Sequence, residues 1–245
     1  MNFKAWQQWG KRPREIESSL TDRALNRLPE MESTKQLVRL ISEVYKPNMR
    51  VLDVGCNVGH YLRGLRRIDP KLDYTGVDAY EQYITKAKEI FSDDSYSSFL
   101  VKDLFNPLFP NEVFDIVYCC NVLLHLPDFR IPVKNLLSVT KHFCFIRTLL
   151  GENTTIVKTA KPTNEFDDEG DPLDYTYQNT WNTDYFVEFI KNLGWKVQLI
   201  EDEFDPLALQ KEYQSVKQEH GTNVISGKQV DGNIIFNWVW VKITK

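Results

Sequence analysis

The sequence predicts an α/β fold, doubly wound, with a mostly parallel central sheet. Two observations favour it: short apolar runs alternate with amphipathic helical patterns, and these runs lack the polar alternation of a strand with one face in water. A third is the glycine-containing turn that directly follows the first run, at the place where such sheets bind ligands. With 245 residues, 42% of them hydrophobic and 26% charged, the chain can bury one large core.

The first regular element expected is a helix over residues 33–46. Its apolar residues recur at helical spacing, Pro47 stops it, and Ser33 with Gln36 has the spacing of a capping box. Residues 1–32 mix polar and aromatic side chains in less regular order. We expect them to form helical pieces that cover the main domain.

Strands and helices then alternate along the chain. The segments expected as strands are short and rich in β-branched and aromatic residues, whereas those expected as helices place apolar residues three and four positions apart. The last helix is the clearest, because its apolar stripe is followed by Gly194 as a stop signal. The expected strands are Arg50–Val54, Tyr74–Val77, Ser98–Lys102, Phe114–Cys120, Phe143–Leu149, Lys196–Ile200 and Asn233–Ile243, and the expected helices are Gly59–Ile68, Glu81–Phe91, Pro132–Thr140 and Asn182–Leu193.

Four regions divide the chain. They are an N-terminal helical cover or lid (1–47), a ligand-binding core (48–150), a cap insertion (151–181) and a C-terminal part that completes the sheet (182–245). The insertion lacks periodicity, and its acidic stretch lacks the spacing of a calcium loop, so a glycine-centred surface turn over the substrate pocket is expected.

Two tryptophans near the start of the chain leave two interpretations open. Trp6 and Trp9, spaced i and i+3, share one helix face and either cover the core or close over the ligand as a lid. In the second interpretation, Trp181 and Tyr185 lie opposite them.

Charge and cysteine content exclude several classes of protein. The net charge is −4, and residues 1–50 hold ten Lys and Arg against six Asp and Glu, a weaker basic footprint than nucleic-acid enzymes usually show. This basic head, with Arg63, Arg66 and Arg67, is either part of a mixed solvated surface or a contact for an anionic substrate such as a phosphorylated sugar. The four cysteines form no CxxC pair and the histidines show no metal-ligand spacing, so we expect reduced thiols and no metal. No apolar stretch predicts a signal peptide or membrane span, so a soluble, cytoplasmic protein is expected.

The decisive segment runs from Val51 to Tyr61. An apolar strand ends in Asp53-Val54, and a turn with Gly55 and Gly59 opens the next helix. Both glycines lack a Cβ, which lets the backbone pass close to a ligand.

Further acids follow the next two strands. Asp78 ends the second strand, where a carboxylate can accept hydrogen bonds from both hydroxyls of a ribose. Asp103 follows the third strand and could accept the exocyclic amine of an adenine. One acid after each of three successive strands predicts a nucleoside-containing ligand.

A nicotinamide-dinucleotide site is the rival interpretation. It needs G-x-G-x-x-G with the pyrophosphate at a helix N-terminus, whereas this turn has only G-x-x-x-G, with Asn57 where the second glycine belongs. S-adenosylmethionine has no phosphate, and Asn tolerates a positive φ better than most residues. A dinucleotide is therefore disfavoured.

These motifs, together with Phe114–Leu126, resemble the class I S-adenosylmethionine-dependent methyltransferases of small molecules over about residues 48–150. The resemblance implies a seven-stranded sheet with an antiparallel last strand and S-adenosylmethionine as cofactor, converted to S-adenosylhomocysteine. It implies that Asp53 and the loop hold the methionine end, Asp78 the ribose and Asp103 with Leu104 the adenine, while Cys120-Asn121 flanks the sulfonium. The cofactor-binding residues expected are Asp53, Gly55, Cys56, Asn57, Gly59, Asp78, Ala79, Asp103, Leu104, Cys120 and Asn121.

The acceptor is less well specified. The Asn-Pro-Pro-Tyr signature of enzymes that methylate amines in nucleic acids is absent, which favours a small-molecule hydroxyl. Ile146-Arg147-Thr148 with Asn164–Asp167 is similar to methyltransferases of bacterial surface-polysaccharide genes, which implies a sugar precursor. His125 follows the fourth strand and is the candidate general base, or else it only packs at a helix start. A nicotinamide oxidoreductase and a non-catalytic S-adenosylmethionine-binding module stay open as alternatives.

Overall fold

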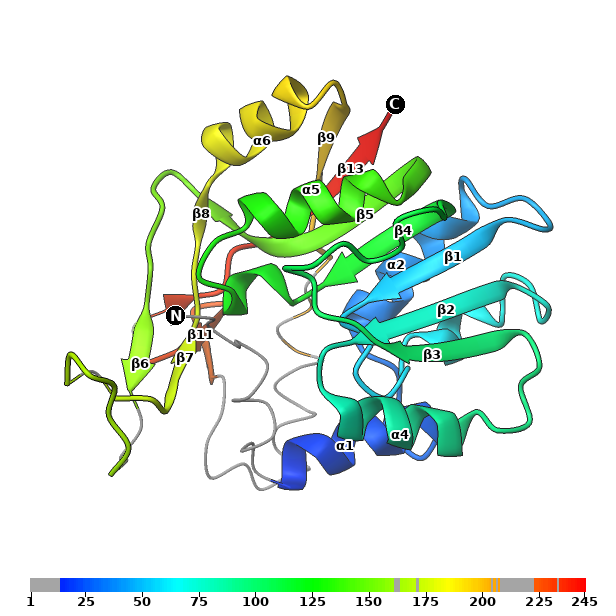
Figure 1. Cartoon of the computed structure of the whole chain (residues 1–245), viewed down its shortest axis with the longest axis horizontal. Helices are drawn as coiled ribbons and strands as arrows, with labels where there is room; N and C mark the ends of the chain where they lie inside the picture. The colour runs from blue at the N-terminus through cyan, green and yellow to red at the C-terminus, as the bar shows by residue number, and fades with distance from the viewer. Residues whose placement is uncertain are drawn as a thin grey trace.

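The computed structural model describes residues 14–160, 164–170, 172–203, 205, 207, 223–232 and 234–245. Seven strands form the main sheet in the order β3-β2-β1-β4-β5-β13-β9, and β8 adds to β5 (Figure 1). β1 to β5 are parallel, whereas β13 is antiparallel to both of its neighbours. The predicted doubly wound, mostly parallel sheet with a reversed last strand is confirmed. The strands are β1 (Arg50–Val54), β2 (Asp73–Asp78), β3 (Ser97–Val101), β4 (Phe114–Cys120), β5 (Thr140–Gly151), β8 (Trp181–Asn182), β9 (Lys196–Glu201) and β13 (Trp238–Thr244).

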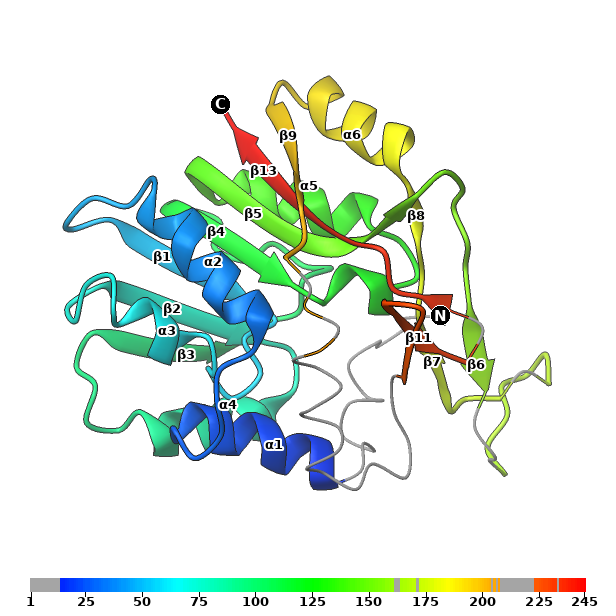
Figure 2. The same cartoon turned by 180° about the vertical axis from the view of Figure 1, so that it is seen from behind.

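Helices cover both faces of this sheet, as Figures 1 and 2 show from opposite sides. One face packs on α5 and α6 through a cluster that includes Val117 and Phe186, and the other packs on α2, α3 and α4 through a cluster that includes Tyr118 and Trp240. Both faces of the central strands are thus buried, which explains their continuous apolar sequence. The helices are α1 (Arg14–Ala24), α2 (Glu32–Ser42), α3 (Leu62–Leu65), α4 (Glu81–Ile90), α5 (Arg130–Ser138) and α6 (Thr183–Asn192), and η2 (Leu123–His125) is a short 3-10 turn.

The capping box expected at the start of α2 is wrong. Met31 occupies the N-cap position without a side-chain hydrogen bond, and Ser33 instead bonds the Tyr61 hydroxyl at 3.0 Å. Gln36 donates to the carbonyl of Glu201 at 2.7 Å and accepts from the indole of Trp240 at 2.8 Å. The helix begins earlier than predicted because these tertiary hydrogen bonds use the side chains that would have capped it.

The helix expected over 59–68 is also shorter than predicted. Only Leu62–Leu65 is α-helical, because the amides of Arg67 and Ile68 bond carbonyls three residues back and tighten the chain into turns. By contrast, α6 begins where the sequence places it, with the Asn182 side chain accepting from the Tyr185 amide at 2.7 Å.

The region 151–181, expected as a cap insertion, contains a hairpin beside the end of β4. β6 (Lys158–Ala160) pairs antiparallel with β7 (Tyr175–Tyr177), and the Asn179 amide donates to the carbonyl of Leu124 at 2.8 Å. A three-stranded sheet follows from β10 (Asn223–Ile225), β11 (Lys228–Asp231) and β12 (Ile234–Ile235). Gly170, with φ +87°, forms the expected turn by bonding the Asp167 carbonyl.

Among the described helices, none is both long and apolar enough to cross a membrane. The residues that the structure describes contain no group of three or more His, Cys, Asp or Glu side chains that could hold a metal ion. All four cysteines are buried free thiols, and burial raises the pKa of each one.

Candidate functional site

The turn after β1 lies at the carboxyl end of the parallel strands and is bonded to β2. The amides of Gly55 and Cys56 both donate to the carbonyl of Val77, at 2.8 and 3.0 Å. A Cβ on Gly55 would lie 2.3 Å from a methyl of Val122, so the turn also packs against the end of β4. Asn57 adopts φ +52° and its side chain accepts from the next amide, which accounts for an Asn in this position. The tips of β1, β2 and β4 therefore meet at one edge, which we call the ligand edge.

Asp78 joins this turn to the tip of β2. One of its oxygens accepts from the Asn57 amide at 3.0 Å, and the other accepts from the Tyr80 amide at 2.9 Å. Burial raises the pKa of Asp78 to about 6, although these amide bonds act to lower it. Each carboxylate oxygen has a second lone pair, so the group can still accept two hydroxyl hydrogen bonds.

The Asp53 side chain is more deeply buried than that of a residue in contact with a ligand. It is 2% exposed, accepts from the Tyr74 hydroxyl at 2.8 Å and stands opposite Gly76 and Tyr118 in the sheet. Burial, with the nearby charge of Asp78 adding to it, raises the pKa of Asp53 to about 7. The structure thus places this carboxyl beneath the turn, where it supports the strand tips.

Asp103 and Leu104 lie just beyond β3. The Asp103 carboxylate accepts from the Phe105 amide at 3.0 Å, and the Lys102 amide bonds the carbonyl of Asp78 at 2.9 Å. The tip of β3 is thereby tied to the tip of β2, with Asp103 half-buried and Leu104 buried. The structure brings these residues to the same edge as Asp78 and Ala79.

The end of β4 carries the remaining predicted residues. Cys120 is buried and closes the strand, and Asn121 follows it with φ +60°, its amide bonded to the carbonyl of Arg147 at 2.9 Å. His125 is half-buried in η2, and its Nδ1 lies 2.8 Å from the carbonyl oxygen of Tyr177 in the cap. The β6–β7 hairpin therefore packs directly against the candidate base.

Sequence reasoning assigned no site role to Arg147 and did not identify Asp202. They form a buried pair beside Asn121, with Nε of Arg147 2.6 Å from the Asp202 carboxylate. A charged residue within the apolar run Phe143–Leu149 is the signal that points to Arg147. No local pattern points to Asp202, which lies 55 positions away.

The aromatic lid interpretation changes in part. Trp6 and Trp9 lie outside the described residues. Trp181 packs into the core against Phe129, with ring centres 5.1 Å apart, and is 4% exposed. It therefore cannot face a lid across an open pocket.

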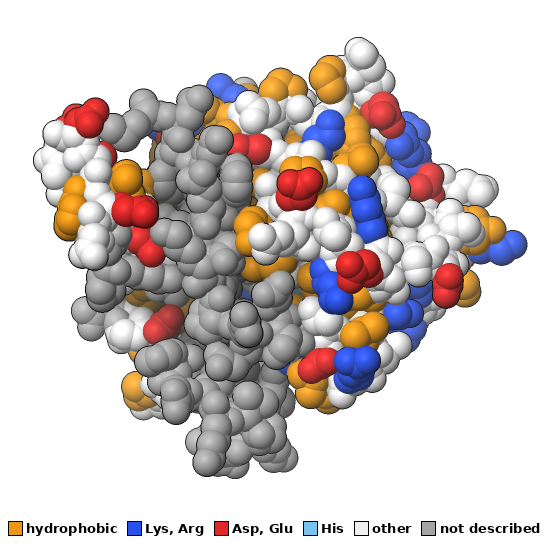
Figure 3. Space-filling model, turned by 60° about the horizontal axis from the view of Figure 1, so that its bottom comes forward, with side chains coloured by type: hydrophobic (Ala, Val, Ile, Leu, Met, Phe, Trp, Pro, Cys, Tyr) orange, Lys and Arg blue, Asp and Glu red, His pale blue; other side chains and the backbone are white. Residues whose placement is uncertain are grey.

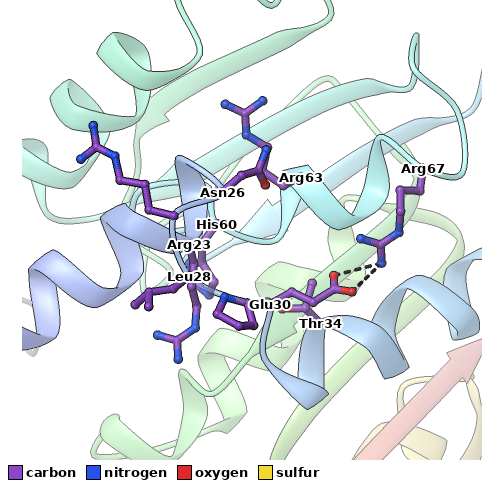
Figure 4. Close-up of a pocket in the computed structure, with 10 residues that line it drawn as sticks. Arg23, Asn26, Leu28, Glu30, Thr34, His60, Arg63 and Arg67 are labelled. Atoms are coloured by element: carbon purple, nitrogen blue, oxygen red, sulfur yellow. Dashed lines mark hydrogen bonds and ion pairs between the residues drawn. The ribbon is translucent and has the colours of Figure 1, made fainter. Parts of the chain in front are cut away.

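The structure has a pocket that Asp53, Asp78 and Asp103 do not line. This pocket of about 470 Å³ opens between the α1–α2 turn and the start of α3, lined by arginines and by buried His60. Arg67 turns onto Glu30 with two bonds of 2.9 Å, while Arg63 extends elsewhere and donates to a backbone carbonyl (Figure 4). Arg66 lies outside this pocket and is paired with Asp94 at 2.8 Å. Arg63, Arg66 and Arg67 therefore each bond to groups of the protein itself.

Surface charge does not favour an anion site either. In the view of Figure 3, basic and acidic side chains are interspersed over the described part of the face, without a large area of one sign. Lys4, Lys11, Arg12 and the side chain of Arg14 lie outside the described part of the protein, so both interpretations of the basic head stay predictions.

Residues 52–143 match the model of a methyltransferase domain family. Over these residues the chain is similar to methyltransferase domains. Over 95 residues it is 35% identical to 2-methyl-6-phytyl-1,4-hydroquinone methyltransferase of Synechocystis, a match that covers 39% of this chain and 30% of that protein. The chain thus spans less than a third of that curated relative.

Solved structures share the fold of this chain. Magnesium protoporphyrin IX methyltransferase from Synechocystis with bound SAM superposes with a TM-score of 0.54 at 15% identity, covering 87% of this chain and 78% of that one. The [4+2]-cyclase SpnF superposes with a TM-score of 0.55 at 14% identity, covering 86% and 80%. At these identities the likeness shows the fold alone.

Proposed function

We propose that this protein binds S-adenosylmethionine and transfers its methyl group to a hydroxyl of a small-molecule acceptor. The observation that carries the proposal is the Asp78 carboxylate, which is bonded to the Asn57 amide and still has lone pairs for a ribose. Methyltransferase relatives and structural neighbours support it, one of them a hydroquinone methyltransferase and one with bound SAM.

The residues at the ligand edge fit this cofactor. Asp78 would take the ribose hydroxyls, the turn from Gly55 to Gly59 the methionine end, and Asp103 the adenine amine. Asp53 would support the turn from below. When bound, S-adenosylmethionine supplies a methyl carbon activated by its sulfonium, so the protein's own task is to position donor and acceptor.

His125 is proposed as the group that takes the acceptor proton. A carbonyl oxygen can only accept, so the 2.8 Å contact with Tyr177 places the proton of a neutral imidazole on Nδ1. The Nε2 atom then carries the lone pair that a general base needs. His125→Ala should lower turnover by about 100-fold while S-adenosylmethionine affinity stays within about twofold, because a general base typically contributes 10²–10⁴-fold.

The acceptor class remains a proposal. The proposal that the acceptor is a sugar hydroxyl of a surface-polysaccharide precursor rests on the residue pattern around Arg147. The named relative, by contrast, is a hydroquinone methyltransferase. A second candidate is chemistry other than methyl transfer on the same fold, because one neighbour is a [4+2]-cyclase. Turnover of S-adenosylmethionine to S-adenosylhomocysteine with a panel of sugar and phenolic acceptors separates these cases.

Calorimetric titration with S-adenosylmethionine, S-adenosylhomocysteine and NAD tests cofactor binding. We expect binding of the first two, with the affinity reduced at least about tenfold in Asp78→Ala, and no binding of NAD. Asp73→Ala is the matched control, because Asp73 is an exposed carboxylate at the opposite end of the same strand. A preference for NAD, or equal losses in the two variants, would refute the proposed site.

A further inference from the structure

A buried ion pair lies at the ligand edge, beside the end of β4. The side chains of Arg147 and Asp202 are 7% and 6% exposed, and two parallel hydrogen bonds of 2.6 and 2.9 Å join them. The indole of Trp238 lies under the guanidinium, 4.0 Å from its central carbon. This bidentate, stacked arrangement fixes the plane of the guanidinium.

The third nitrogen of Arg147 holds Asn121. Its Nη1 donates to Oδ1 of Asn121 at 2.6 Å, and its carbonyl accepts the Asn121 amide at 2.9 Å. Because a guanidinium can only donate, the amide oxygen of Asn121 must face Arg147 and its Nδ2 must face away. Within the described residues Nδ2 has no hydrogen-bond partner, and Asn121 is half-buried. Its donors are thus left for a bound molecule.

The charge of Arg147 poses a problem at this position. A cationic donor bound at the ligand edge would be repelled by a guanidinium that has no counter-charge, and the repulsion would be strong in a partly buried site. Asp202 removes the problem because the bidentate pair is neutral overall. The network therefore supplies a rigid donor fork without a net positive charge.

We propose that Arg147 is a positioning residue that orients the amide of Asn121, and that Asp202 cancels its charge so that the edge accepts a cationic sulfonium. The inference rests on the proposed binding of S-adenosylmethionine. It goes beyond that proposal because it names residues outside the glycine turn and the acid series. These residues give the site an electrostatic preference for S-adenosylmethionine over its neutral product, S-adenosylhomocysteine.

The test compares dissociation constants of S-adenosylmethionine and S-adenosylhomocysteine by calorimetry, because the two ligands differ by one positive charge. Asp202→Asn leaves the guanidinium without a counter-charge. It should raise the ratio of the S-adenosylmethionine dissociation constant to the S-adenosylhomocysteine dissociation constant by roughly tenfold. Arg147→Met leaves the Asp202 carboxylate without a counter-charge and should lower this ratio. The double variant has neither charge and should restore the ratio, while both ligands bind more weakly because Asn121 is no longer held.

Asp94→Asn is the matched control. Asp94 forms a comparable bidentate pair with Arg66 at 2.8 and 2.9 Å, but it precedes β3 and so lies at the opposite edge of the sheet. This variant should lower the thermal midpoint and leave the ratio unchanged.

The outcomes separate the inference from the proposed function. A constant ratio in the three edge variants, with ligand still bound, would overturn the inference alone. Absence of binding to the unaltered protein would overturn the proposed function and the inference with it. Should one single variant fail to fold because it leaves a buried charge uncompensated, the other single variant, compared with the double variant, still decides the question.

Discussion

Replacing Asp53 by Asn should change how the stability of this protein depends on pH. Burial raises the pKa of this carboxyl from 3.8 to about 7, so the folded state binds its proton more tightly than the unfolded state does. Its contribution to stability is therefore fully present below about pH 4 and is lost as the pH rises through 7.

The size of the effect follows from the shift. About three pKa units at about 1.4 kcal/mol each give up to about 4 kcal/mol of stability lost between pH 4 and pH 8 in the unaltered protein. Asn carries no charge at any of these pH values and can still accept from the Tyr74 hydroxyl, as the carboxyl does at 2.8 Å. The stability of Asp53→Asn relative to the unaltered protein should therefore increase by up to this amount as the pH rises.

Urea unfolding followed by circular dichroism at pH 4.5, 6, 7 and 8 measures this difference. Any cost of fitting the amide is the same at every pH, so only the slope matters. Asp73→Asn controls for net charge, because it removes an exposed carboxylate from β2. A difference between Asp53→Asn and the unaltered protein that stays constant over this range would refute the argument from burial.

Three further outcomes follow from the geometry. Affinity for S-adenosylmethionine should fall as the pH drops below about 6, because the pKa of Asp78 is raised to about 6 and only the ionised carboxylate accepts from both ribose hydroxyls. Calorimetry at several pH values measures this affinity, and a pH-independent affinity would contradict the prediction. Gly55→Ala should lower the free energy of unfolding by about 2 kcal/mol or more, because the added Cβ would meet Val122 at 2.3 Å. Gly170→Ala has open space around it and should lower the free energy of unfolding by only about 1 kcal/mol. Equal costs in the two variants would refute the packing argument. Gln36→Leu should cost about 3 kcal/mol in chemical unfolding, because several buried hydrogen bonds are lost, and a change below about 1 kcal/mol would show that these bonds contribute little.

Elements in the middle of the sheet could be predicted closely from the sequence. The bounds of β4, Phe114–Cys120, agree with the expectation because both faces of that strand are buried and its apolar run has clear ends. The bounds around α2 and α3 differ because contacts between distant segments decide them. Gln36, for example, bonds residues 165 and 204 positions away. No local pattern contains that information.

The candidate site, too, could be predicted from the sequence only in part. The sequence brings Asp78, Asp103 and Asn121 to one edge because each follows a parallel strand, and the structure places them there. Whether they bind the cofactor stays a prediction, as does the division of the chain into four regions. Arg147 and Asp202 could not be paired in advance, because only the insertion of β13 between β5 and β9 brings their strands close.

That insertion also sets an order of assembly during synthesis. β9 forms its ladder with β13, from Glu201 opposite Val239 to Lys196 opposite Thr244. Until the ribosome has released the chain as far as Thr244, β9 and its ladder partner cannot be joined to the sheet, and the edge of β5 stays unpaired along its ladder with β13. An unpaired edge of this length invites pairing with other chains. The nascent protein therefore exposes this unpaired side of β5 to misassembly in the interval before β13 emerges.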